Sequence, residues 1–246
     1  MATIASPAAA RLKSDRIFYT GMGLAIAATI LWGFAPTFYL SHWLASPPDT
    51  PRIGILLALH GTIFSAWMAL MVVQPLLVAR RNIPVHRALG LFGMGVAAAM
   101  VVLGNLAGIV AMNVGFHGVG DPFVFYALPF FGINVFAVIM WLAFRWRHVP
   151  ETHKRLILLA NCNVLGAAIA RIPLDLVQAG APFSFIFGPD LIVVAGMLYD
   201  WRTRGRVHRV WLVGGALVVA SQVAMMVSMG TAWWHAFAET MAALAR

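Results

Sequence analysis

Five polar side chains lie inside long apolar runs of this sequence, where ionisable groups are costly and therefore point to function. They are His60, Asn105, Arg171, Asp175 and Asp190. A histidine ligates metals or haem iron and exchanges protons, an arginine binds anionic or carbonyl oxygens, and a carboxyl group takes or gives a proton. His60, Asn105 and Asp190 each lie seven residues from one end of their runs, roughly 10 Å along a helix axis. These residues therefore predict a polar layer at a common depth, which would line a ligand-binding cavity on the outer side of the membrane.

The spacing of Arg171 and Asp175 is i, i+4, so in a continuous helix the two side chains would share a face and pair. Asp190 follows a break at Pro189 and offers Arg171 a second carboxylate from a neighbouring helix. The same residues also fit a purely structural interpretation, in which the charges join two helices and His60 bonds to a backbone carbonyl. The sequence alone supports both interpretations.

Three further histidines share a local pattern, since each is followed by a basic residue and stands at the start of an apolar run. They are His86, His153 and His208. Three imidazoles are a donor set for zinc or iron, and zinc sites commonly combine three protein ligands with water. The adjacent Arg and Lys side chains oppose a divalent cation, however, and they also fit a simpler role as anchors at the membrane surface. A metal site and a structural anchor both remain hypotheses.

Membrane helices must position all of these residues, because the composition excludes a soluble fold. The chain is 61% hydrophobic and 10% charged, whereas about 25% of a soluble domain is charged. Seven runs read as crossings of a bilayer, each of which takes about 20 residues: 17–40, 53–78, 88–112, 122–144, 156–177, 183–199 and 210–233. We therefore expect an all-α integral membrane bundle of about seven transmembrane helices.

The basic residues predict the orientation of this bundle, since Lys and Arg in short loops stay on the cytoplasmic side. Fourteen of the 17 fall before the first run or in alternate loops, while only Arg52 and Arg246 lie on the opposite side. The N-terminus is thus expected inside and the C-terminus outside. The predicted parts are a cytoplasmic tail (1–16), one transmembrane domain (17–233) and a periplasmic tail (234–246). The repeated His-basic starts divide the bundle into one extra helix plus three hairpins.

Four segments of the chain resemble an uncharacterised family of polytopic proteobacterial inner-membrane proteins. They are residues 59–67, 86–90, 153–156 and 199–208, and the resemblance extends from about residue 16 to 235. It implies a bacterial inner (cytoplasmic) membrane and gives weight to His60, His86, His153 and His208. The family has no assigned activity, so the resemblance names no chemistry.

Three functions fit these observations. The first is an inner-membrane binding protein for a redox-type or amphipathic ligand (a quinone, a haem or a lipid), acting as an accessory to an electron-transfer complex with other membrane subunits. The second is a zinc- or iron-dependent lipid-modifying hydrolase that uses the cytoplasmic histidines, and the third is a non-catalytic packing or assembly subunit. The lipid bilayer is the expected partner in each case. The net charge of +9 follows from membrane orientation and does not indicate nucleic acid.

Overall fold

The computed structural model describes residues 7–44, 54–113 and 120–244, and within these ranges every regular element is a helix. The first half of the chain forms α1 (Pro7–Phe34), a π-helical turn η1 (Ala35–Tyr39), α2 (Ile55–Ala79), α3 (Ile83–Asn113) and α4 (Pro122–Arg145). The second half forms α5 (Pro150–Ala160), α6 (Cys162–Ile169), α7 (Asp175–Ala179), α8 (Phe183–Phe187), η2 (Gly188–Asp190), α9 (Leu191–Arg204), η3 (Val210–Gly214), α10 (Gly215–Ser228) and α11 (Ala232–Ala243). Arg52 and Arg246, which contributed to the predicted orientation, lie outside the described residues, as do residues 1–6 of the predicted tail.

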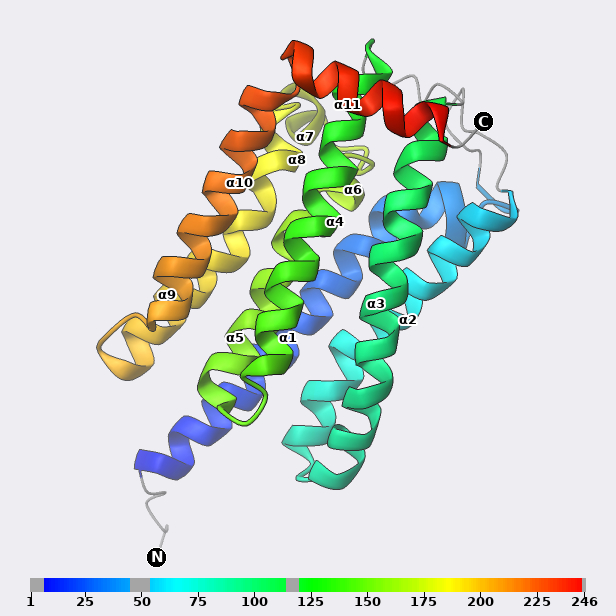
Figure 1. Cartoon of the computed structure of the whole chain (residues 1–246). Helices are drawn as coiled ribbons and strands as arrows, with labels where there is room; N and C mark the ends of the chain where they lie inside the picture. The colour runs from blue at the N-terminus through cyan, green and yellow to red at the C-terminus, as the bar shows by residue number, and fades with distance from the viewer. Residues whose placement is uncertain (1–6, 45–53, 114–119, 245–246) are drawn as a thin grey trace, which may run out of the picture.

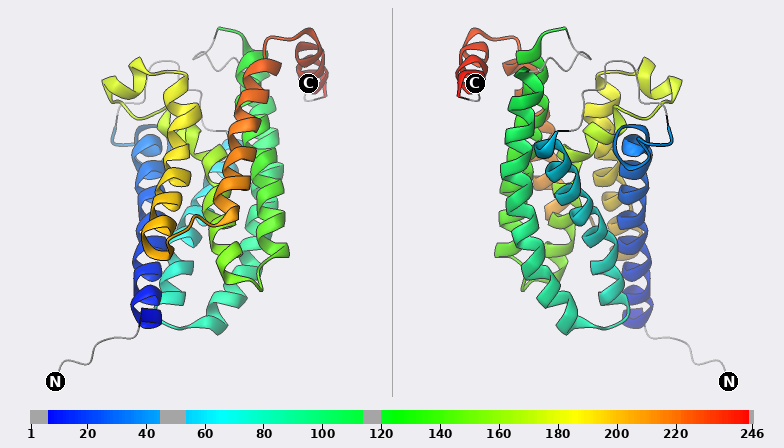
Figure 2. Two further views of the ribbon diagram at one scale, coloured as in Figure 1. Left: turned by 90° about the vertical axis from the view of Figure 1, so that its left-hand side faces the viewer. Right: turned by 90° about the vertical axis from the view of Figure 1, so that its right-hand side faces the viewer.

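The long helices run roughly side by side (Figure 1), with α9 and α10 along one edge of the bundle and α2 and α3 along the other. α1 begins at one end of the bundle, and α11 lies across the opposite end. The two side views in Figure 2 show the same separation between the start of α1 and α11. The helices therefore form a bundle with two distinct ends.

Six helical stretches are long and apolar enough to cross a membrane. They are Arg11–Tyr39, Ile55–Ala79, Ile83–Asn113, Pro122–Arg145, Phe183–Arg204 and Val210–Ser228. Large apolar side chains cover much of the outer surface of the bundle, and several tryptophans are among them, including Trp43, Trp141 and Trp201. Lipid is the environment in which such a surface is stable. The chain is a multi-pass membrane protein.

Local signals in the sequence set where several helices begin and end. The side chain of Asp121 accepts hydrogen bonds from the backbone N–H groups of Phe123 and Val124, which caps the start of α4. The Thr231 side chain caps α11 in the same way. α9 ends where Gly205 adopts a left-handed conformation with φ of 68°, which glycine reaches at little cost. The turn between α9 and η3 is thereby fixed in place.

The predicted run 156–177 is not one helix. The structure divides it at Asn161 into α5 and α6, and α6 ends at Ile169. Pro173 follows shortly after, and a proline disfavours helical conformation in the residue before it. Residues 170–174 form no helix, so the prediction of a helix up to Val177 is wrong.

The two predicted tails also contain structure. α1 begins at Pro7, inside the segment 1–16, and α11 occupies most of the segment 234–246. The indole Nε1 of Trp234 donates to the carbonyl of Phe123 at 2.8 Å, and the side chain of Asn113 donates to the carbonyl of Ala242 at 3.2 Å. These bonds attach α11 to the ends of α3 and α4.

Two close approaches between helices depend on glycine. A Cβ atom on Gly33 of α1 would overlap the backbone carbonyl of Ala168 in α6, and a Cβ on Gly196 of α9 would overlap the indole of Trp211. Trp211 is fully buried and belongs to the main hydrophobic core. The absence of a side chain at these positions lets α1 meet α6 and lets α9 cover Trp211.

Candidate functional site

Asp190 ends η2 and forms the best defined polar contact among the five predicted site residues. Nε2 of Gln222, on α10, donates to Oδ1 of Asp190 at 3.0 Å and to the carbonyl oxygen of Ile186 at 2.9 Å. Both contacts are with acceptors, which fixes the orientation of the amide. Oε1 of Gln222 is buried and accepts no hydrogen bond from the residues that the structure describes.

Asp190 also lies at a shallow groove of about 420 Å³ on the surface of the bundle. α9 contributes Val193, Val194 and Met197 to this groove, and the facing wall is formed by Leu212, Ala216 and Val219 of η3 and α10. Val194, Leu212 and Val219 are each about half exposed, so the groove opens outward. The groove is therefore lined mainly by apolar side chains and has one carboxyl group in its wall.

His60 lies near the start of α2, and Arg171 lies against Phe34 at the end of α1. The His60 ring stacks on Phe64 with a centroid separation of 4.0 Å, and its Nδ1 atom is buried without a hydrogen-bond partner among the described residues. The Arg171 guanidinium lies 4.8 Å from the ring centroid of Phe34 and donates to the carbonyl of Ala167 at 2.7 Å.

Asn105 pairs with an amide that the sequence analysis did not single out. Nδ2 of Asn134, on α4, donates to Oδ1 of Asn105 at 3.1 Å, and each amide also donates to a carbonyl one turn earlier in its own helix. Asn134 lines a second shallow groove, of about 280 Å³, next to Leu217 of α10. The two asparagines therefore join α3 to α4.

The predicted helical pair of Arg171 and Asp175 does not form as proposed, because no helix contains both residues. Arg171 follows α6, and Asp175 begins α7 and is exposed. Asp190 makes no ion pair within the described residues, so it is not a second carboxylate for Arg171. The helices that carry His60 and Asp190 also lie apart, since α2 is on the edge of the bundle opposite α9 and α10 (Figure 1).

Each of the three histidines that precede a basic residue uses Nδ1 in a contact with the protein. His153 donates to the carbonyl of Ala143 at 2.9 Å, and His208 accepts from the backbone N–H of Val210 at 3.2 Å. In the orientation of the Gln74 amide that satisfies its neighbours, the amide nitrogen donates to Nδ1 of His86 at 2.6 Å. Within the described parts of the chain, no three His, Cys, Asp or Glu side chains form a group that could hold a metal ion. The structure thus does not gather His86, His153 and His208 into the predicted metal site.

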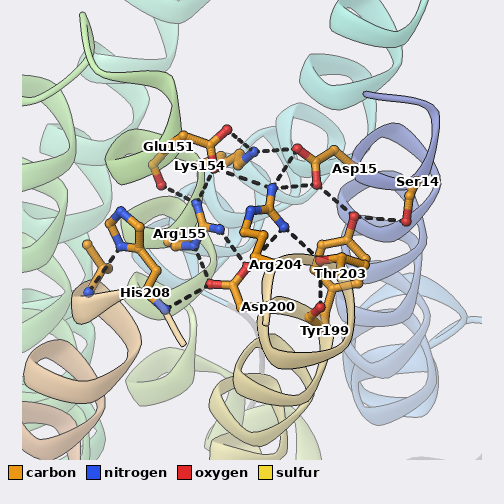
Figure 3. Close-up of polar contacts among 11 residues, drawn as sticks. Ser14, Asp15, Glu151, Lys154, Arg155, Tyr199, Asp200, Thr203, Arg204 and His208 are labelled. Atoms are coloured by element: carbon orange, nitrogen blue, oxygen red, sulfur yellow. Dashed lines mark hydrogen bonds and ion pairs between the residues drawn. The ribbon is translucent and has the colours of Figure 1, made fainter. Parts of the chain in front are cut away.

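An ion-pair network near the start of α1 was not predicted. Its centre is Arg155 of α5 and Asp200 of α9, whose side chains are both 0% exposed. Arg155 donates from Nε to Oδ2 of Asp200 at 2.8 Å and from a terminal nitrogen to Oδ1 at 2.5 Å (Figure 3). The backbone N–H of His208 donates to the same carboxylate at 3.2 Å. Such a bidentate pair has a defined geometry as well as a high interaction energy.

The network continues from this pair to α1. Arg204 contacts Asp200 at 3.2 Å and Asp15 at 2.8 Å, and Lys154 contacts Asp15 at 2.7 Å. Tyr199 donates its hydroxyl proton to Asp15 at 2.7 Å. α1, α5 and α9 are thereby connected at one end of the bundle (Figure 3).

Glu151 completes the network on its exposed side, with a side chain that is 49% exposed. It contacts Lys154 at 2.7 Å and Arg155 at 2.8 Å. Burial alone would raise the pKa of Glu151, but the hydrogen bonds from these two cations outweigh it and hold the pKa below its usual range. The three carboxylates and three cations of the network balance in charge: Asp15, Glu151 and Asp200 against Lys154, Arg155 and Arg204.

A spacing signal for this network is present in the sequence. Glu151 and Arg155 are four residues apart, as are Asp200 and Arg204, so each pair shares a helix face. The positive-inside rule accounts for the basic residues without requiring any acidic partner, so it assigns no role to the acidic residues among them. The presence of carboxylates within these basic segments was the signal for the network that the sequence analysis missed.

Comparison with known proteins gives no relative for this chain, since no family model, curated protein or solved structure matches it. The resemblance to an uncharacterised inner-membrane family therefore stays a prediction. The function has to be argued from the geometry alone.

Proposed function

We propose that this chain is a protein of the bacterial inner membrane that binds an amphipathic ligand, such as a quinone or another lipid, between α9 and α10. The ligand's polar head contacts Asp190, which is held by a hydrogen bond from Gln222, and its apolar tail occupies the groove beside it. An accessory role in an electron-transfer complex is the setting in which a bound quinone would be used.

The proposal includes seven crossings with the N-terminus in the cytoplasm. α1 and α11 lie at opposite ends of the bundle, and an odd number of crossings accounts for that separation. α5 and α6 together supply the crossing that is missing from the six long apolar stretches. The basic residues concentrated at the end where α1 begins support the same direction.

In this orientation Asp190 lies at some depth in the outer half of the membrane. It is seven residues from Phe183, the first residue of its membrane-spanning stretch, which corresponds to roughly 10 Å along a helix. An ionisable group at such a depth is expensive and usually serves a site.

One observation carries the proposal: a carboxyl group with an amide partner lines an apolar groove that opens outward. Small-molecule sites combine apolar walls with a few polar groups that orient the ligand. Because the groove lies on the surface of the bundle, a lipid can enter it directly from the surrounding bilayer.

The test is saturable binding of lipids and quinones to the purified protein in lipid nanodiscs, with mass spectrometry of the molecules that co-purify. Ala216 is exposed and lines the groove, so we expect Ala216→Phe to fill the groove and abolish both saturable binding and co-purification. Ala224 is exposed on the same helix away from the groove, and Ala224→Phe is the matched control. Equal binding by the wild type and both variants would refute the proposal and favour a packing subunit.

A further inference from the structure

The chemistry of the ligand's head follows from which hydrogen-bonding atoms the site leaves available, an inference that rests on the function proposed above. The two N–H bonds of the Gln222 amide are both in use, one toward Asp190 and one toward the carbonyl of Ile186. Oε1 of Gln222 is buried and without a donor among the described residues. The amide therefore has no N–H left to donate to a ligand, and its buried oxygen lies outside the lining of the groove.

Asp190 has the same character. Its Oδ1 atom accepts the bond from Gln222, and Oδ2 has no hydrogen-bond donor within the part of the chain that the structure describes. In its ionised form, which a bound cation stabilises, the carboxyl group of Asp190 accepts hydrogen bonds and cannot donate them. The carboxyl group in the wall of the groove consequently presents one acceptor oxygen to a ligand, Oδ2 of Asp190.

The carboxylate of Asp190 also lacks a cationic partner among the residues that the structure describes. No Lys, Arg or His of the described residues forms an ion pair with Asp190, although six other charged side chains of the chain are paired in the network around Arg155. A carboxylate in apolar surroundings is costly unless a cation or a hydrogen-bond donor approaches it. The other walls of the groove are aliphatic side chains, which offer neither.

We propose that the site selects amphiphiles whose head donates hydrogen bonds, and that it binds a protonated long-chain amine most tightly. A quinol, with hydroxyl donors, binds in the same way but less tightly, because it carries no charge. Heads that only accept, such as the carbonyls of a quinone or the carboxylate of a fatty acid, meet the acceptor oxygen of Asp190 and are rejected. The aliphatic walls accept the tail of any of these molecules.

The experiment compares matched pairs of ligands that differ only in the head. Dissociation constants are measured in nanodiscs for a long-chain amine and the fatty acid of equal length, and for a quinol and its quinone with the same isoprenoid tail. We expect the donor-headed member of each pair to bind at least about tenfold more tightly, the ratio that one additional charge-assisted hydrogen bond produces.

A substitution at the head position tests the assignment of the acceptor. Asp190→Asn keeps an oxygen for Gln222 and replaces the second oxygen by an NH₂ donor, so we expect the preference for the amine to be lost and the fatty acid to bind more tightly than to the wild type. Asp175→Asn removes an exposed carboxylate outside the groove and should leave the preference unchanged.

The outcomes separate this inference from the proposed function. If every ligand binds saturably and Ala216→Phe blocks binding, but donor and acceptor heads bind equally or acceptors bind more tightly, the inference is overturned and the binding function stands. If no ligand binds saturably, or if Ala216→Phe changes nothing, the proposed function itself fails. A preference for donors that persists in Asp190→Asn would also overturn the inference.

Discussion

At the residue scale, the strongest constraint is the pair of Arg155 and Asp200. Both side chains are fully buried, and their hydrogen-bonding groups have partners on α5, α9 and the following turn. The solvation that two such ions lose is large, so their attraction contributes little net stability compared with apolar residues of the same volume. Removal of one partner is different, since it leaves the other charge buried without compensation.

Asp200→Asn should therefore lower the free energy of unfolding by about 3–5 kcal/mol, the usual effect of breaking a buried pair. Unfolding of the purified protein in mixed micelles measures this change. Glu151→Gln is the control, because Glu151 is 49% exposed and an exposed pair contributes about 1 kcal/mol or less. A small effect of Asp200→Asn would mean that the bundle does not depend on the pair.

The pKa of Glu151 gives the network a dependence on pH. Its pKa in the folded protein lies below its usual range because hydrogen bonds from Lys154 and Arg155 outweigh the effect of burial. A carboxylate with a lowered pKa stabilises the fold above its unfolded-state pKa, about 4.3, and this contribution disappears as the pH falls through the folded-state pKa. We expect the wild type to lose more stability than Glu151→Gln between pH 6 and about pH 3. Parallel pH profiles of unfolding would contradict the assignment.

At the element scale, the sequence predicts where apolar helices occur better than where they are interrupted. The predicted runs 53–78, 88–112 and 122–144 correspond to α2, α3 and α4, because a long apolar run without charges has only one stable form in lipid. The prediction of one helix over residues 156–177 was wrong because the effects of Asn161 and Pro173 on the backbone depend on the residues around them. Mean hydropathy does not report such effects.

The candidate site shows the same limit. Asp190 could be selected from its depth alone, but its partner Gln222 lies 32 residues later on another helix. The network was missed for a related reason, since Asp15 and Arg204 are 189 residues apart. Contacts between distant segments depend on how the helices pack. Spacing within one helix shows which residues share a face of that helix, but it does not show which other helix they contact.

The contact between α1 and α6 leads to a prediction about glycine. A Cβ on Gly33 would overlap the backbone carbonyl of Ala168, which cannot move aside as a side chain can. Gly33→Ala should lower the free energy of unfolding by about 1–3 kcal/mol, the cost typical of overpacking. Gly21→Ala, also in α1, places a Cβ where nothing lies within 4 Å and should be neutral or stabilising by up to about 1 kcal/mol. Thermal unfolding in detergent compares the two variants, and equal effects would argue against close packing of α1 on α6.

At the scale of the whole molecule, the proposed orientation can be tested by labelling. Cys162 is 1% exposed, so a membrane-impermeant maleimide should react only with new cysteines. In intact cells we expect Asp121→Cys and Asp175→Cys to be labelled from outside, and Arg81→Cys and Arg147→Cys to be labelled only after permeabilisation. Labelling of Arg81→Cys in intact cells would contradict the proposed orientation. Protection of Asp175→Cys from the reagent would contradict the proposal that α5 and α6 together cross the membrane.

The network that joins α1, α5 and α9 also has a consequence for biosynthesis. Asp15 leaves the ribosome early, yet its partner Lys154 follows 139 residues later and Arg204 follows 189 residues later. The first helix therefore enters the membrane with a carboxylate that gains its first cation only with α5 and its second only with α9. A chain that stops before α9 lacks Asp200 and Arg204, so Arg155 loses its buried carboxylate partner and Asp15 loses one of its two cations. An incomplete chain therefore differs from the finished protein by unpaired charge at the end of the bundle where α1 begins.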